Sequence, residues 1–342
     1  MSGPHRTIDH PLAGAKAWLV TDGKTGMDVQ AKGVADALGL TAEWRHVAPT
    51  GAFRFLSPWG PVSRTEGIGR GTSRFGPPWP DVVIATGRLS IPYVRAIRRR
   101  AGLSTYTVVL QDPRTGPRTA DFIWVPEHDR LRGANVFTTP TAPHSFSAAR
   151  LAELRARMPA EIARLSRPLV AVILGGKNGV YKFTDACDDR LKGALASIAA
   201  LGASFLITPS RRTHPRLLRA VDDATRGSPR ILWDGSGENP YPGFLAHADL
   251  LVVTADSVNM TGEACATGKP VLVFRPEGGS AKFDRFHQRL EALGATRALP
   301  DKLDALPLWT YEPINAADAI AAEIARRMAR RRGMLTGQAA SA

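Results

Sequence analysis

Short apolar runs alternate with amphipathic stretches along almost the whole chain. In the first half this pattern predicts strands at 17–21, 44–47, 81–86, 106–111, 121–125 and 135–138. In the second half it predicts strands at 169–174, 204–208, 231–233, 250–253 and 271–274. Between the strands of both halves it predicts helices, including 28–38, 184–201, 213–223 and 281–293. Alternation of strands and helices predicts an α/β fold of parallel sheets covered by helices on both faces.

The pattern restarts in the middle of the chain. A polar helix predicted at 146–165 and the hinge-like Ser166-Arg167-Pro168 precede a new strand at Leu169. At 342 residues the chain is also long for a single hydrophobic core. We therefore predict two Rossmann-like domains, at 1–165 and 166–310, followed by a C-terminal helix and basic tail at 311–342.

One segment of the first domain breaks the alternation. Residues 48–80 contain six prolines, six glycines, four arginines and one acidic residue, together with several aromatic residues. An irregular insertion of this length inside a compact domain is usually functional or disordered, and its aromatic residues argue against disorder. Two hypotheses remain open: a lid or contact surface for a membrane or partner, and a loop packed on its own domain.

Composition narrows the class of protein. Hydrophobic residues make up 44% and charged residues 22% of the chain, and no apolar run reaches the length of a membrane span. The N-terminus MSGPHRTIDH lacks a signal-peptide core, and the two cysteines, Cys187 and Cys265, have no metal-ligand spacing. We therefore expect a cytoplasmic protein without a resident cofactor or metal. Nothing in the sequence predicts the oligomeric state.

The net charge of +14 adds a candidate partner. The arginines are scattered and show no nucleic-acid-binding signature, so we expect no nucleic-acid partner. In the C-terminal helix Ile320, Ile324 and Met328 share one face beside a run of arginines from Arg326 to Arg332. A basic amphipathic helix of this kind predicts peripheral contact with an anionic membrane surface. The alternative is that residues 314–324 pack against the first domain and leave only the arginines exposed.

Glycine-rich and polar turns follow several predicted strands of the second domain. Ligands of an open parallel sheet bind at the carboxyl ends of its strands, so these turns form the candidate binding site. Gly175 and Gly176 would let backbone amides approach a phosphate. Glu263, one turn into the helix after 250–253, could accept both hydroxyls of a ribose. The full predicted nucleotide site consists of Gly175, Gly176, Lys177, Ser210, Arg211, Arg212, Trp233, Asp256, Ser257, Asn259, Met260 and Glu263.

Some members of this site have a second explanation. Arg211 and Arg212 would oppose the dipole of the helix predicted after them, so we favour a bound phosphate over a solvated pair. Ser210 or Thr213 could cap that helix. The Trp233 side chain either stacks on a base or is a half-buried indole.

In the first domain the turn TDGKTGM (21–27) leads from the first strand into a helix. Its glycines give access to positive φ, and the amides of a helix N-terminus attract anions. We predict an acceptor-side loop of Gly23, Lys24, Gly26 and, after the strand at 81–86, Arg88. A simple helix cap by Asp22 or Thr25 is the alternative.

Together these motifs resemble a known family. The stretch ADSVNMTGEACATGKPVLVF (255–274) is similar to the donor half of GT-B glycosyltransferases. The fuller series TDGKTG, ATGRLSIP, QDPR, PEHD, GGKNGVYKF, SRRTHP, WDGSGENPY and TADSVNMTGEACATGKPV, over about 20–295, resembles the bacterial relatives of the plant mitochondrial fission factor named for elongated mitochondria. The resemblance implies a GT-B-like fold of two facing Rossmann domains, with a nucleotide sugar in the interdomain cleft.

The resemblance also implies that, if the protein is an inverting transferase, its first domain contains a base that deprotonates the acceptor hydroxyl. The candidates at strand ends are Asp22, Asp112, His128 and Asp129, and the sequence does not choose among them. Three hypotheses of function follow. The first is a metal-independent glycosyltransferase with a membrane-associated acceptor. The second is a GT-B-shaped binding or scaffold protein without turnover, and the third is a nucleotide-sugar epimerase.

Overall fold

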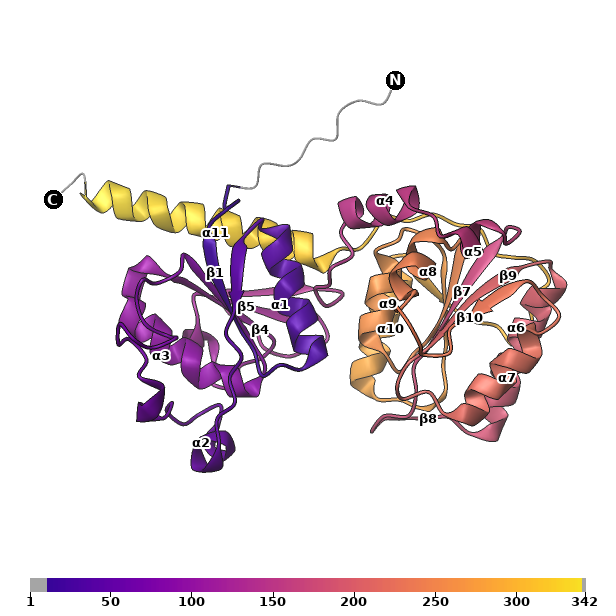
Figure 1. Ribbon diagram of the computed structural model, residues 1–342, viewed down its shortest axis with the longest axis horizontal. Helices are drawn as coiled ribbons and strands as arrows, with labels where there is room; N and C mark the ends of the chain where they lie inside the picture. Colours follow the sequence, from indigo (N-terminus) through magenta and orange to yellow (C-terminus); the bar gives the residue numbers. More distant parts are fainter. Residues whose placement is uncertain (1–10, 340–342) are drawn as a thin grey trace, which may run out of the picture. The chain divides into compact units, whose positions relative to one another are not determined.

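The computed structural model describes residues 11–339 of the 342-residue chain. Residues 1–10, where the sequence shows no signal-peptide core, and 340–342 of the basic tail lie outside the described residues. The chain forms two compact units (Figure 1). The first unit contains the chain up to Ser145 and again from Ala316 onward, and the second contains Phe146–Asn315.

The first unit is built on a six-stranded parallel sheet. Its strands are β1 (Lys16–Val20), β2 (Thr41–Trp44), β3 (Val82–Thr86), β4 (Tyr106–Leu110), β5 (Phe122–Pro126) and β6 (Val136–Thr139). They lie in the order β2-β1-β3-β4-β5-β6. Every residue of β3 and β4 is buried, as expected for strands covered on both faces.

Helices α1 (Thr25–Ala37) and α11 (Ala316–Ala339) cover one face of this sheet, and α3 (Ile91–Ala101) covers the other (Figure 1). Successive strand residues point to opposite faces, so Leu19 packs with α1 and α11 while Trp18 and Val20 pack with α3. Short 3-10 turns complete the unit: η1 (Arg64–Glu66), η2 (Arg88–Ser90), η3 (Gly102–Ser104) and η4 (Pro117–Thr119).

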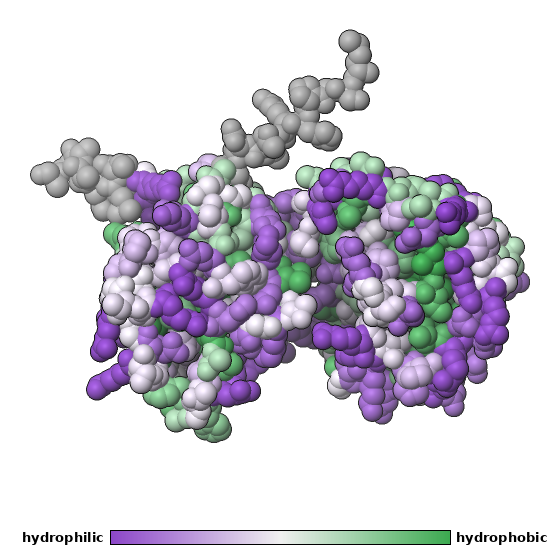
Figure 2. All heavy atoms as spheres, viewed as in Figure 1, coloured by the Kyte–Doolittle hydropathy of each residue, from purple (hydrophilic) through white to green (hydrophobic). Residues whose placement is uncertain are grey.

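The segment 48–80 is packed in one part and exposed in another. It contains η1 and α2 (Gly51–Leu56). Phe75 is fully buried between Trp18 and Tyr93, so the later part of the segment packs on its own domain. By contrast, Phe55 and Trp59 are 83% and 62% exposed. Figure 2 shows the apolar surface over α2, the helix at the bottom of the first unit in Figure 1.

The second unit repeats this architecture with another six-stranded parallel sheet. Its strands are β7 (Leu169–Leu174), β9 (Ser204–Pro209), β10 (Arg230–Leu232), β11 (Leu250–Thr254), β12 (Val271–Phe274) and β14 (Thr296–Ala298), in the order β10-β9-β7-β11-β12-β14. The short strands β8 (Tyr181–Lys182) and β13 (Glu277–Gly278) pair separately. The sequence pattern missed β14 because this edge strand, Thr-Arg-Ala, contains no apolar run.

Helices cover both faces of the second sheet as well. One face packs against α6 (Asp185–Ala200) and α7 (Pro215–Thr225). The other packs against α4 (Ala148–Ala156), α5 (Ala160–Ala163), α8 (Tyr241–His247), α9 (Val258–Cys265) and α10 (Ala281–Ala292). The predicted α/β class with two Rossmann-like parallel sheets is therefore confirmed.

The first unit ends at Ser145 rather than at the predicted 165. The single helix expected at 146–165 is two helices, because α4 ends at Ala156 and α5 begins at Ala160. Pro159 lies between them, and proline disfavours helical backbone in the residue before it. Leu151 and Ile162 of these helices are buried with Phe244 and Leu245 of α8. They belong to the second unit because their apolar side chains complete its core.

The C-terminal helix α11 returns to the first unit. Ile320, Ile324 and Met328 do share one face, but all three are buried against α1 and the sheet. Burial extends beyond the predicted limit of 324, while Ile314 packs with the core of the second unit. The apolar stripe of the proposed membrane helix is therefore already covered. Among the described residues, no helix is long and apolar enough to span a membrane.

Candidate ligand-binding sites

The strand order places one switch point in the second sheet. β7 and β11 are neighbours, and the helices that follow them, α6 and α9, cover opposite faces of the sheet. The loops leaving these two strands therefore diverge at the carboxyl edge, where open α/β sheets bind ligands. The turn from Gly175 and the turn around Asp256 occupy this position.

Asp256 joins these two loops. Its carboxylate accepts hydrogen bonds from the Gly176 amide at 2.9 Å, the Thr254 hydroxyl at 2.7 Å and the Arg212 guanidinium at 3.2 Å. The side chain is completely buried, and this burial raises the pKa of Asp256. A Cβ on Gly175 would lie 2.2 Å from the carboxylate, so only glycine fits there. Asp256 therefore acts as a structural link rather than an open ligand group.

This link changes the predicted role of the glycine turn. The Gly175 amide donates to Thr254 Oγ1 at 2.7 Å and the Gly176 amide to Asp256, so both already have acceptors within the protein. The Lys177 side chain is exposed at the same turn and has no ion pair among the described residues. Of this turn, Lys177 is the group placed to meet an anion.

Helix α9 begins beside this turn. Ser257 is its N-cap, and the Ser257 hydroxyl accepts a hydrogen bond from the Met260 amide at 3.4 Å. Asn259 is exposed in the first turn. The first turn of α9 therefore lies at the switch point.

Glu263 lies further along α9 and is partly buried. The Tyr241 hydroxyl of α8 donates a hydrogen bond of 2.5 Å to Glu263 Oε2. Loss of hydration raises the pKa of Glu263 to about 7, against the opposing effect of the Tyr241 hydrogen bond. Hydrophobic pattern does not indicate Tyr241 as the partner of Glu263, because it lies 22 residues away on another helix.

The turn after β9 holds Ser210, Arg211 and Arg212. The predicted cap is wrong: α7 begins at Pro215 and His214 is its N-cap, accepting from the Arg216 amide at 3.2 Å. Ser210 and Thr213 instead hydrogen-bond each other within the turn. The two arginines consequently precede the helix rather than opening it, and the supposed conflict with its dipole is weaker. Arg211 is exposed and has no ion pair among the described residues.

Trp233 lies just beyond β10, and its side chain is half-buried. The indole Nε1 donates to the Ser236 carbonyl at 2.7 Å, which closes the following loop. The half-buried alternative describes this indole well. Its strand is two positions from β7 in the sheet, since β9 lies between them.

The first sheet has its own switch point between β1 and β3. Asp22 follows β1, and its Oδ2 contacts Lys24 Nζ at 2.5 Å. Asp22 Oδ1 is buried without a hydrogen-bond partner among the described residues, close to Gly87 after β3. Gly23 has φ of 76°, as the predicted glycine turn requires.

The other acceptor-side residues lie around this turn. Gly26 is exposed in the first turn of α1. The Arg88 guanidinium donates to the carbonyl of Ser57 and so ties the 48–80 segment to the end of β3. Neither Asp22 nor Thr25 caps α1, because its N-cap is Lys24 and no side chain fills that role.

The four candidate bases do not form one cluster. Asp112 follows β4, and its carboxylate accepts from the Arg114 amide at 2.8 Å, which shapes the turn. His128 and Asp129 follow β5, in a turn where the Asp129 amide donates to Pro126. Because β1 and β5 are three strand spacings apart, Asp22 and His128 are separated by roughly 14 Å along the edge.

The structure also shows a pair that the sequence analysis missed. His46 Nε2 lies 3.5 Å from Asp28 Oδ2, and the Thr21 hydroxyl donates to Asp28 Oδ1 at 2.5 Å. His46 stacks on Trp44 with ring centroids 5.3 Å apart. The predicted strand at 44–47 hid this residue inside the sheet, whereas β2 ends at Trp44 and leaves His46 beyond the edge. The pairing of β1 with β2 could have indicated this contact, because the residues that follow two adjacent parallel strands lie at the same edge of the sheet.

Two parallel α/β units with these strand orders define the GT-B-like class. The fold is similar to that of UDP-GlcNAc 2-epimerase from Methanocaldococcus jannaschii, with a TM-score of 0.52 and 13% identity over 92% of this chain and 99% of that one. At this identity the similarity establishes the fold alone.

The chain belongs to the mitochondrial fission ELM1 family, whose model matches residues 25–328. It is 30% identical over 276 residues to the mitochondrial fission protein ELM1 of Arabidopsis thaliana, covering 74% of this chain and 65% of that protein. It is 31% identical over 161 residues to an uncharacterized protein of Rickettsia prowazekii, covering 45% of each. The chain thus spans less than two thirds of either relative, and the resemblance read from the sequence is confirmed.

Proposed function

We propose that the second unit binds a nucleotide sugar at the carboxyl edge of its sheet, as a glycosyltransferase-like protein. The observation that carries this proposal is the switch point, where Asp256 fixes the β7 turn beside the first turn of α9. Helix N-termini at such positions attract phosphates. The name of the structurally similar M. jannaschii enzyme contains UDP-GlcNAc, which makes that compound the first ligand to test.

The phosphate end of the ligand is proposed to lie at the first turn of α9. Ser257 and Asn259 provide hydroxyl and amide groups there, and Met260 contributes its backbone. Lys177 and Arg211 supply positive charge that no carboxylate of the described residues neutralises. A diphosphate would supply that missing negative charge.

The ribose end is proposed to lie at Glu263. Oε2 of this carboxylate accepts from Tyr241, and Oε1 retains capacity to accept from a ribose hydroxyl. Tyr241 fixes the orientation of the carboxylate before the ligand arrives, which lowers the entropy lost on binding.

The acceptor is proposed to be at an anionic membrane surface. This part rests on Phe55, Leu56 and Trp59, which are exposed within the 48–80 segment, a segment that also contains four arginines. It no longer rests on the apolar stripe of α11. Pelleting of the protein with anionic but not neutral vesicles would support it, and equal, negligible pelleting with both would contradict it.

Thermal and calorimetric titration with UDP, GDP, ADP, CMP and UDP-GlcNAc tests the nucleotide site. A ligand present at ~100 times its Kd should add about 2.7 kcal/mol to the free energy of unfolding. Glu263→Ala should weaken binding at least about tenfold, because it removes a hydrogen bond to a charged group. Glu161→Ala, at an exposed position of α5, is the matched control and should bind as the parent does.

Two results would contradict the proposal. One is the absence of stabilisation by every nucleotide, and the other is equal affinity in Glu263→Ala and the parent. Turnover is a separate question, answered by measuring release of free nucleotide from the sugar nucleotide that binds. Binding without release would identify a protein that holds the ligand without transferring its sugar.

A further inference from the structure

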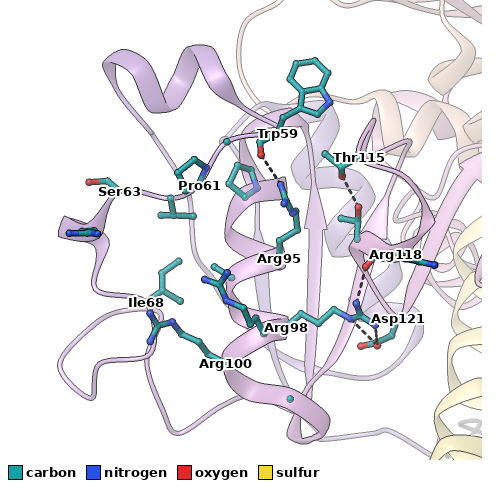
Figure 3. Close-up of a pocket in the computed structure, with 18 of the residues that line it drawn as sticks. Trp59, Pro61, Ser63, Ile68, Arg95, Arg98, Arg100, Thr115, Arg118 and Asp121 are labelled. Atoms are coloured by element: carbon teal, nitrogen blue, oxygen red, sulfur yellow. Dashed lines mark hydrogen bonds and ion pairs between the residues drawn. The ribbon is translucent and has the colours of Figure 1, made fainter.

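A groove with a volume of about 1300 Å³ runs beside α3 in the first unit. Figure 3 shows Arg95, Arg98 and Arg100 extending from α3 into this region, with Ser63 and Ile68 on one side and Asp121 on the other. Arg99 of the same helix also lines the groove. One helix therefore contributes four guanidinium groups to a single concave surface.

Four further arginines line the groove from other segments. Arg64 and Arg70 come from the 48–80 segment, Arg118 comes from the loop between β4 and β5, and Arg331 comes from α11. The stem of Arg100 lies against Gly69, where an added Cβ would be 2.5 Å from Arg100 Cδ. The 48–80 segment and α3 thus form the two walls of one site.

Three of these arginines are held in place by the protein. Arg95 Nη1 donates to the Trp59 carbonyl at 2.9 Å. Arg98 binds Asp121 at 3.1 Å and the Arg118 carbonyl at 2.8 Å. Arg331 binds the Leu103 carbonyl at 2.9 Å and lies 3.3 Å from Asp121. These contacts fix the positions of the guanidinium groups before any ligand binds.

The groove is strongly unbalanced in charge. Asp121 is the one carboxylate among its lining residues, and Arg98 and Arg331 share it. The other six arginines form no ion pair with any described carboxylate. Like charges gathered in one concave surface repel one another, so the free protein holds this arrangement at an electrostatic cost.

We propose that this groove binds a ligand carrying two or more phosphate groups. The guanidinium fork matches phosphate oxygens in bidentate fashion, which favours phosphate over a smaller anion. A single phosphate carries about −2 charge at most and would leave most of the six unpaired arginines unneutralised.

Two sources share this chemistry: a soluble polyphosphorylated molecule, and a membrane surface where neighbouring anionic phospholipids present several phosphate groups together. The exposed side chains of Trp59 and Leu103 at the groove, 62% and 66% accessible, could contact the apolar part of either. The groove lies in the first unit and the proposed nucleotide site in the second, so failure of one proposal does not imply failure of the other.

The test uses the full chain and a variant with one arginine changed on each wall, Arg70→Ser/Arg99→Ser. Both residues are exposed and unpaired, so the substitution should leave the fold intact. The matched control is Arg130→Ser/Arg330→Ser, which removes the same charge from exposed positions of the same unit outside the groove. Binding is measured by calorimetry with tripolyphosphate and by co-sedimentation with phosphatidylglycerol–phosphatidylcholine vesicles.

We expect the parent and the control to bind at least one of these probes with similar affinity. The groove variant should bind about tenfold or more weakly, and added salt should weaken the parent. Tripolyphosphate binding without sedimentation indicates a soluble ligand, whereas sedimentation that tripolyphosphate displaces indicates a lipid headgroup. No binding of either probe, or equal losses in groove and control variants, would overturn the proposal.

Discussion

At the scale of single residues, the two acidic side chains of the second switch point have different roles. Asp256 is fully buried, and three donors from separate segments hold its carboxylate, so it organises the loops. Glu263 has one protein donor, Tyr241, and a pKa raised to about 7 by loss of hydration. A carboxyl of this kind is costly to ionise, and such sites are often functional.

The sign of this effect predicts the pH dependence of stability. The folded-state pKa of Glu263 lies above the ordinary value of 4.5, so folding takes up a proton between about pH 4.5 and pH 7. Its favourable contribution is present at low pH and is lost as the pH rises through 7. Glu263→Gln keeps an acceptor for Tyr241 and cannot ionise. We expect it to be more stable than the parent at pH 8, on the order of 2 kcal/mol, with the difference narrowing towards pH 5.

Urea unfolding at both pH values measures this difference. Glu161→Gln, an exposed change in the same unit, should show no pH-dependent difference from the parent. If Glu263→Gln tracks the parent at every pH, its carboxyl is not destabilised by burial, and the assignment of a raised pKa fails.

At the scale of elements, α11 shows how one helix can serve a core far from it in sequence. Its buried face includes Ile320 and Ile324, both fully covered by α1 and the first sheet. On the same helix Glu323 pairs with Arg326 and Arg327, and Arg327 also donates to the Ala134 carbonyl at 2.9 Å. The hydrogen bonds from the two arginines lower the pKa of Glu323 to about 2. The basic sequence that predicted a membrane helix therefore has a structural explanation within the unit.

Truncation of this buried face should destabilise the protein. Ile324→Ala removes a fully buried side chain and leaves a cavity, so the free energy of unfolding should fall by about 2–5 kcal/mol. Ala329→Ser changes an exposed position of the same helix and should stay within about 0.5 kcal/mol of the parent. Denaturant unfolding followed by circular dichroism measures both. A loss in Ile324→Ala as small as that in the control would mean that α11 does not pack in solution as described.

At the scale of the whole molecule, the two units differ in how the chain builds them. The second unit is one continuous segment, whereas the first needs residues from both ends of the chain. Without α11, the face formed by Leu19, Val34 and Leu38 would lose part of its cover. We therefore expect the second unit to fold by itself, and we expect residues 1–145 not to fold without α11.

Two fragments test this expectation. Residues 146–315 should show one cooperative thermal transition and bind the same nucleotide as the full chain, because they contain the complete second core and its switch point. Residues 1–145 should lack a cooperative transition, and adding a 316–342 peptide should restore it. A cooperative transition in 1–145 alone would show that the first core is complete without α11.

The sequence by itself determined the class of the fold and the elements that carry the candidate residues of the second unit. Continuous apolar runs such as Leu169–Leu174 and Leu250–Thr254 indicate strands buried on both faces. This pattern can be recognised without knowing which distant residues the strands contact. The position of Glu263 on the helix after β11 follows from the same local rule. Short polar edge strands such as β14 could not be found this way, since they bury little apolar surface.

Only the tertiary structure decided what the side chains at those positions contact. Asp256 reaches the Gly176 amide 80 residues away, and Tyr241 reaches Glu263 from another helix. The return of α11 to the first sheet and the gathering of Arg70, Arg99 and Arg331 in one groove are likewise contacts between distant segments. The spacing of apolar residues in the sequence indicates which face of a helix or strand is buried. The packing of the whole unit decides which residues that face contacts.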